Sequence, residues 1–316
     1  MKLHNDIKNF TELIKTASHQ LPGGIKEEFV EKDYWITQVL SQLSKSKYAA
    51  ESVFKGGTSL SKGFGLIDRF SEDVDIAIIN SNQKSGNEIK NIIRTVEKQM
   101  TSELTEINVE GVTSKGSRFR KSVFEYQSII EKNNNNKLIV EVNSFANPFP
   151  YQKATIKSFV YDFLIQTSNE KYIDQYHLQP FSINVLNKEQ TLLEKFVSLI
   201  RCSFEENAME SLSKKIRHFY DLYFLMIDAD GAMFIKSKTF KKQFDEIVRH
   251  DKEMFEEPIG WQNKLVATSP LIINFDSYWK QLKEKYRTEL SVLAYTPIPD
   301  EKLIAKQFKQ LIKLIQ

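Results

Sequence analysis

A glycine pair followed by an aspartate pair is the part of this sequence best suited to chemistry. Gly56 and Gly57 end a short apolar run and allow a sharp backbone turn that a side chain would hinder. Downstream, Asp73 and Asp75 alternate with apolar residues in the extended run 73–78. Successive side chains of a strand point to opposite faces, so both carboxylates point the same way. Such a pair repels itself unless a cation lies between the two groups.

The residues around the glycine turn suit a phosphate. Thr58 and Ser59 are good helix N-cap residues, and the sequence predicts a short helix from Leu60 to Phe64. Backbone N–H groups at such a helix start bind phosphate oxygens, and the two hydroxyls could add donors. Mg²⁺ takes carboxylate and phosphate oxygens, so the acids and the turn together predict phosphoryl transfer. Taken singly, a glycine pair is usually a loop and an Asp-x-Asp is usually two solvated acids.

The combined motif resembles a known family. Gly-Gly-Thr-Ser-Leu-Ser-Lys at 56–62, followed by Arg-Phe-Ser-Glu-Asp-Val-Asp at 69–75, is similar to the AbiEii/AbiGii toxin family of nucleotidyltransferases, in the polymerase-β-like superfamily. The resemblance implies an α+β fold with a mixed-sheet catalytic domain. The pattern along the chain becomes mainly helical from about Thr167, which predicts a catalytic domain at 1–166 and a mainly helical domain at 167–316. The resemblance also implies that Asp73 and Asp75 bind the metal. The implied nucleotide-binding residues are Gly56, Gly57, Thr58, Ser59, Lys62, Arg69 and Ser71.

A third carboxylate is predicted on a second strand. The run 137–144 alternates like the first acidic strand and leaves Glu141 on the face opposite its apolar residues. Members of the superfamily often take a third metal ligand from a neighbouring strand, usually an aspartate. Glu141 is therefore a candidate metal ligand, with a solvated surface acid as the equal alternative.

The region beyond residue 167 holds two further candidates. Asp221 lies in an otherwise apolar and aromatic run, 219–227, where an unpaired carboxylate would be costly. Arg217, four residues earlier, could pair with it along one helix. The resemblance implies a sharper role, because Glu194-Lys195 and Tyr220-Asp221-Leu222 match family motifs. It implies that Lys195 acts on the nucleotide phosphates and that Asp221 orients it or acts as a base.

Three other charged or aromatic features leave alternatives open. The cations of 115–121 and the lysines of 213–242 suit either RNA phosphates or a solvated surface. Glu31-Lys32-Asp33-Tyr34 also looks like the family, but a solvated helical face is the favoured interpretation, with Lys32 as an alternative phosphate ligand. Trp261 and Trp279 suit either base stacking or, more often, a core.

Composition bounds the class of protein. The 316 residues carry a formal charge of only +3, so any contact with nucleic acid must be local. Cys202 is the single cysteine, and no secretory leader or membrane-spanning run is evident. We therefore expect a cytoplasmic protein without a membrane partner.

These observations predict an Mg²⁺-dependent nucleotidyltransferase, with Mn²⁺ as the alternative ion. The resemblance implies a toxin of a toxin–antitoxin or abortive-infection system that transfers NMP from an NTP to RNA, with tRNA favoured. It also implies control by a cognate antitoxin. The alternatives are transfer to a protein or a small molecule, and a catalytically idle module that binds RNA or a partner.

Overall fold

The computed structural model describes residues 1–71, 73–79, 83–130 and 136–316, and it divides into two compact units. Glu72, which belongs to the motif at 69–75, lies outside the described residues. The first unit contains residues 1–65 and 70–186, and the second contains 66–69 and 187–316. Their boundary lies at Leu186/Asn187 rather than at 166/167, because the last strand before it belongs to the sheet of the first unit.

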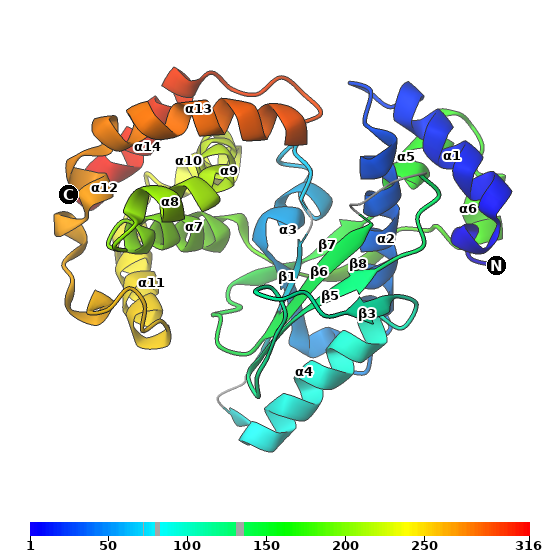
Figure 1. The fold of residues 1–316 in the computed structure, drawn as a ribbon, viewed down its shortest axis with the longest axis horizontal. Helices are drawn as coiled ribbons and strands as arrows, with labels where there is room; N and C mark the ends of the chain where they lie inside the picture. Colours follow the sequence, from blue (N-terminus) through cyan, green and yellow to red (C-terminus); the bar gives the residue numbers. More distant parts are fainter. Residues whose placement is uncertain (72, 80–82, 131–135) are drawn as a thin grey trace. The chain divides into compact units, whose positions relative to one another are not determined.

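The described residues of the first unit form an eight-stranded mixed sheet in the order β3-β5-β6-β2-β1-β8-β7, with β4 paired to β5 (Figure 1). Strand β2 pairs antiparallel with β1 and parallel with β6, while β1 pairs parallel with β8. The strands are β1 Ser52–Lys55, β2 Asp73–Ile78, β3 Thr105–Ile107, β4 Ser114–Lys115, β5 Phe119–Glu125, β6 Lys137–Asn143, β7 Tyr151–Ile156 and β8 Phe181–Leu186.

Alternation along β2 and β6 follows the sequence pattern. Val74 and Ile76 of β2 are fully buried, whereas Asp73 and Asp75 on the other face are half-buried. Strand β6, predicted at 137–144, pairs antiparallel with β5. The mixed sheet and its helices make the protein α+β, as predicted.

The helices of the first unit include one element that differs from expectation. They are α1 Ile7–Gln20, α2 Glu27–Ser44, α3 Gly56–Lys62, α4 Gly86–Met100, α5 Phe159–Gln166 and α6 Lys171–Tyr176. The charged residues Glu31, Lys32 and Asp33 of α2 are 0%, 2% and 3% exposed. The predicted solvated face is therefore wrong, because these side chains lie among other elements instead of in water.

The second unit is helical, and its core is aromatic. Its helices are α7 Lys188–Cys202, α8 Ala208–Lys214, α9 Ile216–Ile227, α10 Ala229–Phe234, α11 Phe240–Met254, α12 Pro270–Ile273, α13 Phe275–Leu293 and α14 Glu301–Ile315. Phe219 contacts the rings of Trp279 and Phe308. Trp261 and Trp279 are 0% and 6% exposed, which confirms the core interpretation for both.

The segment 66–69 joins this helical unit although it lies between α3 and β2 in the chain. Arg69 forms an isolated antiparallel bridge with Ala294, and Tyr295 N donates to the carbonyl of Asp68 at 3.0 Å. The backbone of this segment is thus fixed by the residues that follow α13. Among the described residues, no helix has the length and apolar character needed to cross a membrane.

Candidate active site

The glycine turn and the acidic strand lie against each other. Strand β1 ends at Lys55, which is the register partner of Asp75, and α3 begins at Gly56. Gly56 has a φ of +83°, and a Cβ placed on it would lie 2.2 Å from Asp75 Oδ2. Only glycine tolerates both this backbone conformation and this contact. The close approach of carboxylate and turn that the sequence predicted is therefore present.

Helix α3 starts earlier than predicted, and this changes the roles of Thr58 and Ser59. Lys55 is the N-cap, so both residues lie within the helix and do not cap it. Thr58 Oγ1 donates to the carbonyl of Asp73, and Ser59 Oγ donates to the carbonyl of Gly56 at 2.9 Å. Each hydroxyl has one proton, so neither is a ready donor to phosphate. The backbone N–H groups of the first turn remain the natural phosphate ligands.

Three carboxylates lie on adjacent positions of two strands. Asp73 and Asp75 share a face of β2, and Asp75 is the register partner of Glu141 on the parallel strand β6. Glu141 also accepts from Asn143 Nδ2 at 3.2 Å. Hard divalent cations such as Mg²⁺ prefer carboxylate oxygens of this kind. The described residues contain no group of three or more His, Cys, Asp or Glu side chains that could hold a metal ion by themselves. The donor set therefore fits an ion held by the aspartate pair and completed by phosphate.

Buried charges of α2 hold the elements around this site. Asp33 Oδ1 accepts from Lys62 Nζ at 2.7 Å, and its Oδ2 accepts from Phe159 N at 2.8 Å. Glu31 accepts from Ser128 Oγ and from Ile129 N, both at 2.7 Å. Sequence reasoning missed these contacts. The available signal was three consecutive charges within a helix whose neighbouring positions are apolar throughout.

The approach to β2 packs on the same helix. Phe70 stacks on Phe29 with ring centroids 4.5 Å apart, and Lys32 Nζ lies 5.7 Å from the Phe70 centroid. Ser71 is 8% exposed and directly follows this stack. The segment that leads to the aspartates is therefore fixed by aromatic and cation–π contacts.

In the second unit, Asp221 is the centre of a buried ion cluster. Arg69 donates from Nε to Asp221 Oδ1 at 2.7 Å and from Nη2 to Oδ2 at 2.6 Å. Lys195 Nζ lies 2.8 Å from the same Oδ2. Arg217 instead pairs with Glu289 at 3.4 Å, so the predicted pair of Arg217 with Asp221 is wrong. The structure thus brings together Lys195 and Asp221, as the family motifs suggested, and adds Arg69.

Electrostatics fix the charge of this cluster. Burial raises the pKa of Asp221, but the Arg69 and Lys195 cations outweigh that effect and lower the pKa to about 2. Burial and the nearby Lys195 and Lys215 cations hold the pKa of His218 well below its usual value. His218 is therefore held as a neutral imidazole by its burial and by these cations. The sequence analysis did not single it out.

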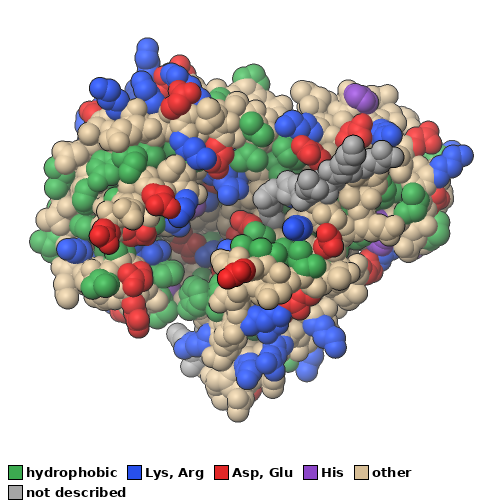
Figure 2. All heavy atoms as spheres, viewed as in Figure 1, with side chains coloured by type: hydrophobic (Ala, Val, Ile, Leu, Met, Phe, Trp, Pro, Cys, Tyr) green, Lys and Arg blue, Asp and Glu red, His purple; other side chains and the backbone are tan. Residues whose placement is uncertain are grey.

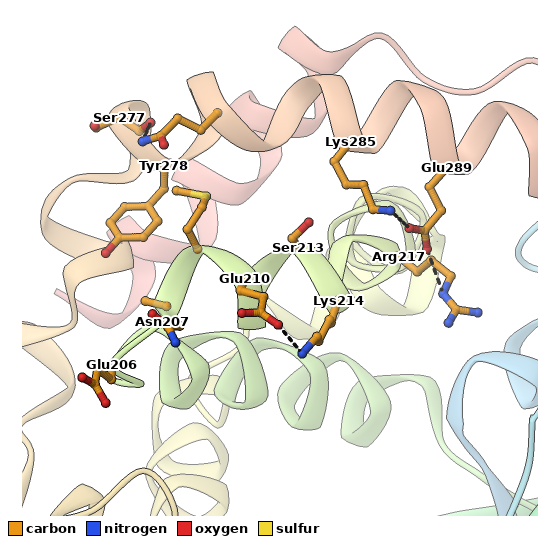
Figure 3. Close-up of a pocket in the computed structure, with 13 residues that line it drawn as sticks. Glu206, Asn207, Glu210, Ser213, Lys214, Arg217, Ser277, Tyr278, Lys285 and Glu289 are labelled. Atoms are coloured by element: carbon orange, nitrogen blue, oxygen red, sulfur yellow. Dashed lines mark hydrogen bonds and ion pairs between the residues drawn. The ribbon is translucent and has the colours of Figure 1, made fainter. Parts of the chain in front are cut away.

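A groove of about 1140 Å³ lies between α8 and α13 of the second unit (Figure 3). Its cations face acids across short distances, with Lys214 2.6 Å from Glu210 and Lys285 3.1 Å from Glu289. Over much of the face in Figure 2 basic and acidic side chains lie close together, whereas basic side chains gather at its lower tip. The pairing in the groove offers a polyanion little net attraction.

The predicted cation cluster at 115–121 is also partly paired. Lys115 forms an ion pair with Glu106, and Arg120 forms one with Glu97. Lys121 is the register partner of Glu141. Two of the four cations therefore have acidic partners, Lys115 in an exposed pair and Arg120 in a largely buried one, and both pairs weaken the attraction of these cations for RNA phosphates.

Comparisons with known proteins agree with the motif. The family model described as "Nucleotidyl transferase AbiEii toxin, Type IV TA system" matches residues 38–306. No curated protein matches the chain. Among solved structures, MenT4, a nucleotidyltransferase toxin from Mycobacterium tuberculosis H37Rv, is 13% identical, with a TM-score of 0.38 and coverage of 96% of this chain and 98% of that one. A TM-score this low adds no support to that given by the family match.

Proposed function

Because the chain belongs to the AbiEii family of nucleotidyltransferase toxins of type IV toxin–antitoxin systems, we propose that it transfers NMP from an NTP to RNA. The acceptor we favour is tRNA, and the ion we favour is Mg²⁺, with Mn²⁺ as a substitute. A type IV system implies a cognate antitoxin. The single observation that carries the proposal is the close approach of the Asp75 carboxylate to Gly56, which supports a metal ligand beside a phosphate-binding turn.

Different residues of the first unit would bind the divalent cation and the triphosphate. Asp73 and Asp75 would hold the divalent cation, which when bound neutralises phosphate charge and polarises the reacting phosphoryl group. Backbone N–H groups at the start of α3, from Gly56 and Gly57 onward, would seat the triphosphate. Glu141 would support Asp75 from the neighbouring strand.

The cluster of the second unit supplies positive charge in a fixed orientation. We assign Lys195 to the negative charge that develops on pyrophosphate as it leaves. Asp221 holds the Lys195 ammonium by a short buried contact, which orients it. We assign Asp221 to this positioning role because its carboxylate already accepts from two cations.

The test is incubation with each labelled NTP and Mg²⁺, with either total tRNA or a protein extract as acceptor. Label is expected in the RNA fraction, to vanish with EDTA and to return with Mg²⁺ or Mn²⁺. Asp73→Asn and Asp75→Asn are each expected to reduce labelling by at least ~10²-fold, because each removes a metal ligand. Glu210→Gln, on the exposed face of α8, is the matched acid control and should label normally.

Each other outcome assigns a different function. Label in protein alone would identify a protein acceptor, and label in neither fraction with retained RNA binding would identify an idle binding module. Full activity in both aspartate variants would overturn metal-dependent transfer. Glu141→Gln tests whether a third carboxylate binds the metal. If Glu141 is a metal ligand, this variant should need a higher Mg²⁺ concentration for activity.

A further inference from the structure

The buried charges of α2 are too costly to be explained by stability alone. Glu31, Lys32 and Asp33 are each at most 3% exposed. Moving an ion out of water carries a desolvation penalty that a salt bridge often fails to recover, and apolar residues would fill the same space at lower cost. Burial also raises the pKa of Asp33, despite the Lys62 cation beside it. What such charges supply is directional contact with particular partners.

The partners of Asp33 are the ends of two other helices. Lys62 is the last residue of α3, and its Nζ lies 2.7 Å from Asp33 Oδ1. The same ammonium donates to the carbonyl of Lys157, and Phe159 N, at the start of α5, donates to Asp33 Oδ2. Asp33 therefore joins α2, the end of α3 and the start of α5 at one buried point.

Helix α3 depends on such contacts for its orientation. It spans only Gly56–Lys62, and isolated helices of this length are not stable in water. Its first residue lies against Asp75, its Thr58 hydroxyl is bonded to the Asp73 carbonyl, and its last residue is held by Asp33. Fixing both ends of a short rigid helix fixes where its first-turn N–H groups point.

We propose that Asp33 is a positioning residue for the nucleotide site, and that Lys62 acts by holding α3 to Asp33 and not by binding phosphate. Six residues of helix separate Lys62 from Gly56, a rise of about 9 Å. To reach phosphate the ammonium would have to leave Asp33 as an uncompensated buried carboxylate. The inference rests on the proposed function and replaces the phosphate-binding role predicted for Lys62.

A double-mutant cycle separates the two roles of Lys62. Asp33→Asn, Lys62→Met and the double variant are assayed for NTP binding by equilibrium dialysis with Mg²⁺, and for the KM of NTP and kcat in RNA labelling. Each single variant is expected to weaken NTP binding by ~10-fold or more, since small displacements at a reacting site are costly. The double variant should be no weaker than the worse single one, because both remove the same link. Lys62→Arg, which keeps the cation, should retain most of the affinity.

The opposite pattern overturns the proposal. If Lys62 binds phosphate itself, Lys62→Met alone weakens binding, Asp33→Asn binds normally, and the double variant resembles Lys62→Met. Should Asp33→Asn fail to fold, Asp33→Glu keeps the charge and moves the carboxylate by one methylene, and it must still weaken NTP binding.

A matched control excludes general loosening of the fold. Glu97 of α4 is equally buried, at 4% exposed, and bonds Arg120 and Ser122 on β5. Glu97→Gln should lower the urea midpoint as Asp33→Asn does, yet leave NTP affinity unchanged. An equal loss of NTP affinity in Glu97→Gln would overturn a specific role for Asp33.

The binding measurement also keeps this inference separate from the proposed function. A wild type that binds NTP with Asp33–Lys62 coupling but labels no RNA contradicts the function and supports the positioning role. A wild type that labels RNA while Asp33→Asn binds NTP normally contradicts only the positioning role.

Discussion

Asp33 in the first unit and Asp221 in the second are both buried carboxylates, but their surroundings differ. Asp33 faces one cation, Lys62, and one backbone N–H. Asp221 faces two cations, Arg69 and Lys195, through three contacts of 2.6–2.8 Å. Burial raises the pKa of both groups, yet the pKa of Asp33 ends above its ordinary value and that of Asp221 falls to about 2.

The two acids differ in the number of cations beside them, and the acid with more cations has the lower pKa. One cation leaves the desolvation penalty of Asp33 dominant, whereas two outweigh it at Asp221. Asp221 is therefore suited to holding other charged side chains in place at any physiological pH. Asp33 is suited to joining helices, where geometry matters more than a strongly favoured charge.

The largest predicted effect is the loss of Asp221. Asp221→Asn leaves Arg69 and Lys195 buried without this counter-charge, and we expect a loss of about 3–5 kcal/mol in the opening free energy of α9. Peptide-resolved hydrogen exchange measures this within the second unit alone. The α2 peptides of the first unit serve as the internal control. A loss below about 1 kcal/mol would show that the ion cluster around Asp221 does not stabilise α9 strongly.

Asp33→Asn is expected to lower the local opening free energy by less than Asp221→Asn does. Asp33→Asn removes the charge beside one cation, Lys62, whereas Asp221→Asn removes the charge beside two, so we expect a loss of about 1–3 kcal/mol in the opening free energy of α2. Hydrogen exchange of the α2 amides gives the value, with α9 amides now as the control. Equal losses in the two variants would contradict the comparison, because the number of cations beside each carboxylate would then not affect stability.

The two acids should give opposite pH dependence. The lowered pKa of Asp221 means that its stabilisation is present above the unfolded value of about 3.9 and is lost as pH falls toward about 2. The full loss amounts to about 2–3 kcal/mol. The raised pKa of Asp33 means that the folded state holds the proton more tightly, so stability falls as pH rises from about 3.9 through the folded value.

Unfolding free energies of the wild type, Asp33→Asn and Asp221→Asn between pH 2 and 6 measure both slopes. The advantage of the wild type over Asp221→Asn should shrink as the pH falls. Its stability relative to Asp33→Asn should increase over the same change. Slopes of the same sign in both comparisons would contradict the opposite pKa shifts.

Local periodicity was enough to predict the acidic strand. Alternation placed Asp73 and Asp75 on one face and Glu141 on the matching face of a second strand, because a strand repeats every two residues wherever it lies in the sheet. The glycine turn could also be predicted from the sequence, because a φ of +83° as at Gly56 strongly favours glycine. The helix start was wrong by a few residues because Thr58 and Ser59 bond backbone carbonyls instead of capping.

Partners far apart in the chain could not be predicted from local pattern. Asp33 and Lys62 are 29 residues apart, and Arg69 and Asp221 are 152 apart. Helical spacing offered only Arg217 as a partner for Asp221, and the structure gives Arg217 to Glu289. The solvated interpretation of the charges at 31–33 is wrong because nothing local distinguishes a solvated charge from a buried one whose partner lies elsewhere in the chain.

The smallest predicted effect comes from an exposed ion pair, which we expect to stabilise its helix less than either buried carboxylate does. Lys241 and Asp245 of α11 are 3.1 Å apart, as close as many buried pairs, but their side chains are 54% and 58% exposed. Water screens both charges, so Lys241→Ala should change the opening free energy of α11 by only about 0.3–0.5 kcal/mol and salt should reduce that further. Hydrogen exchange of the α11 amides at low and high salt measures it, with Asp245→Ala as the matched variant. A loss comparable to that of Asp33→Asn would mean that distance alone, and not burial and cation number, determines the strength of these pairs.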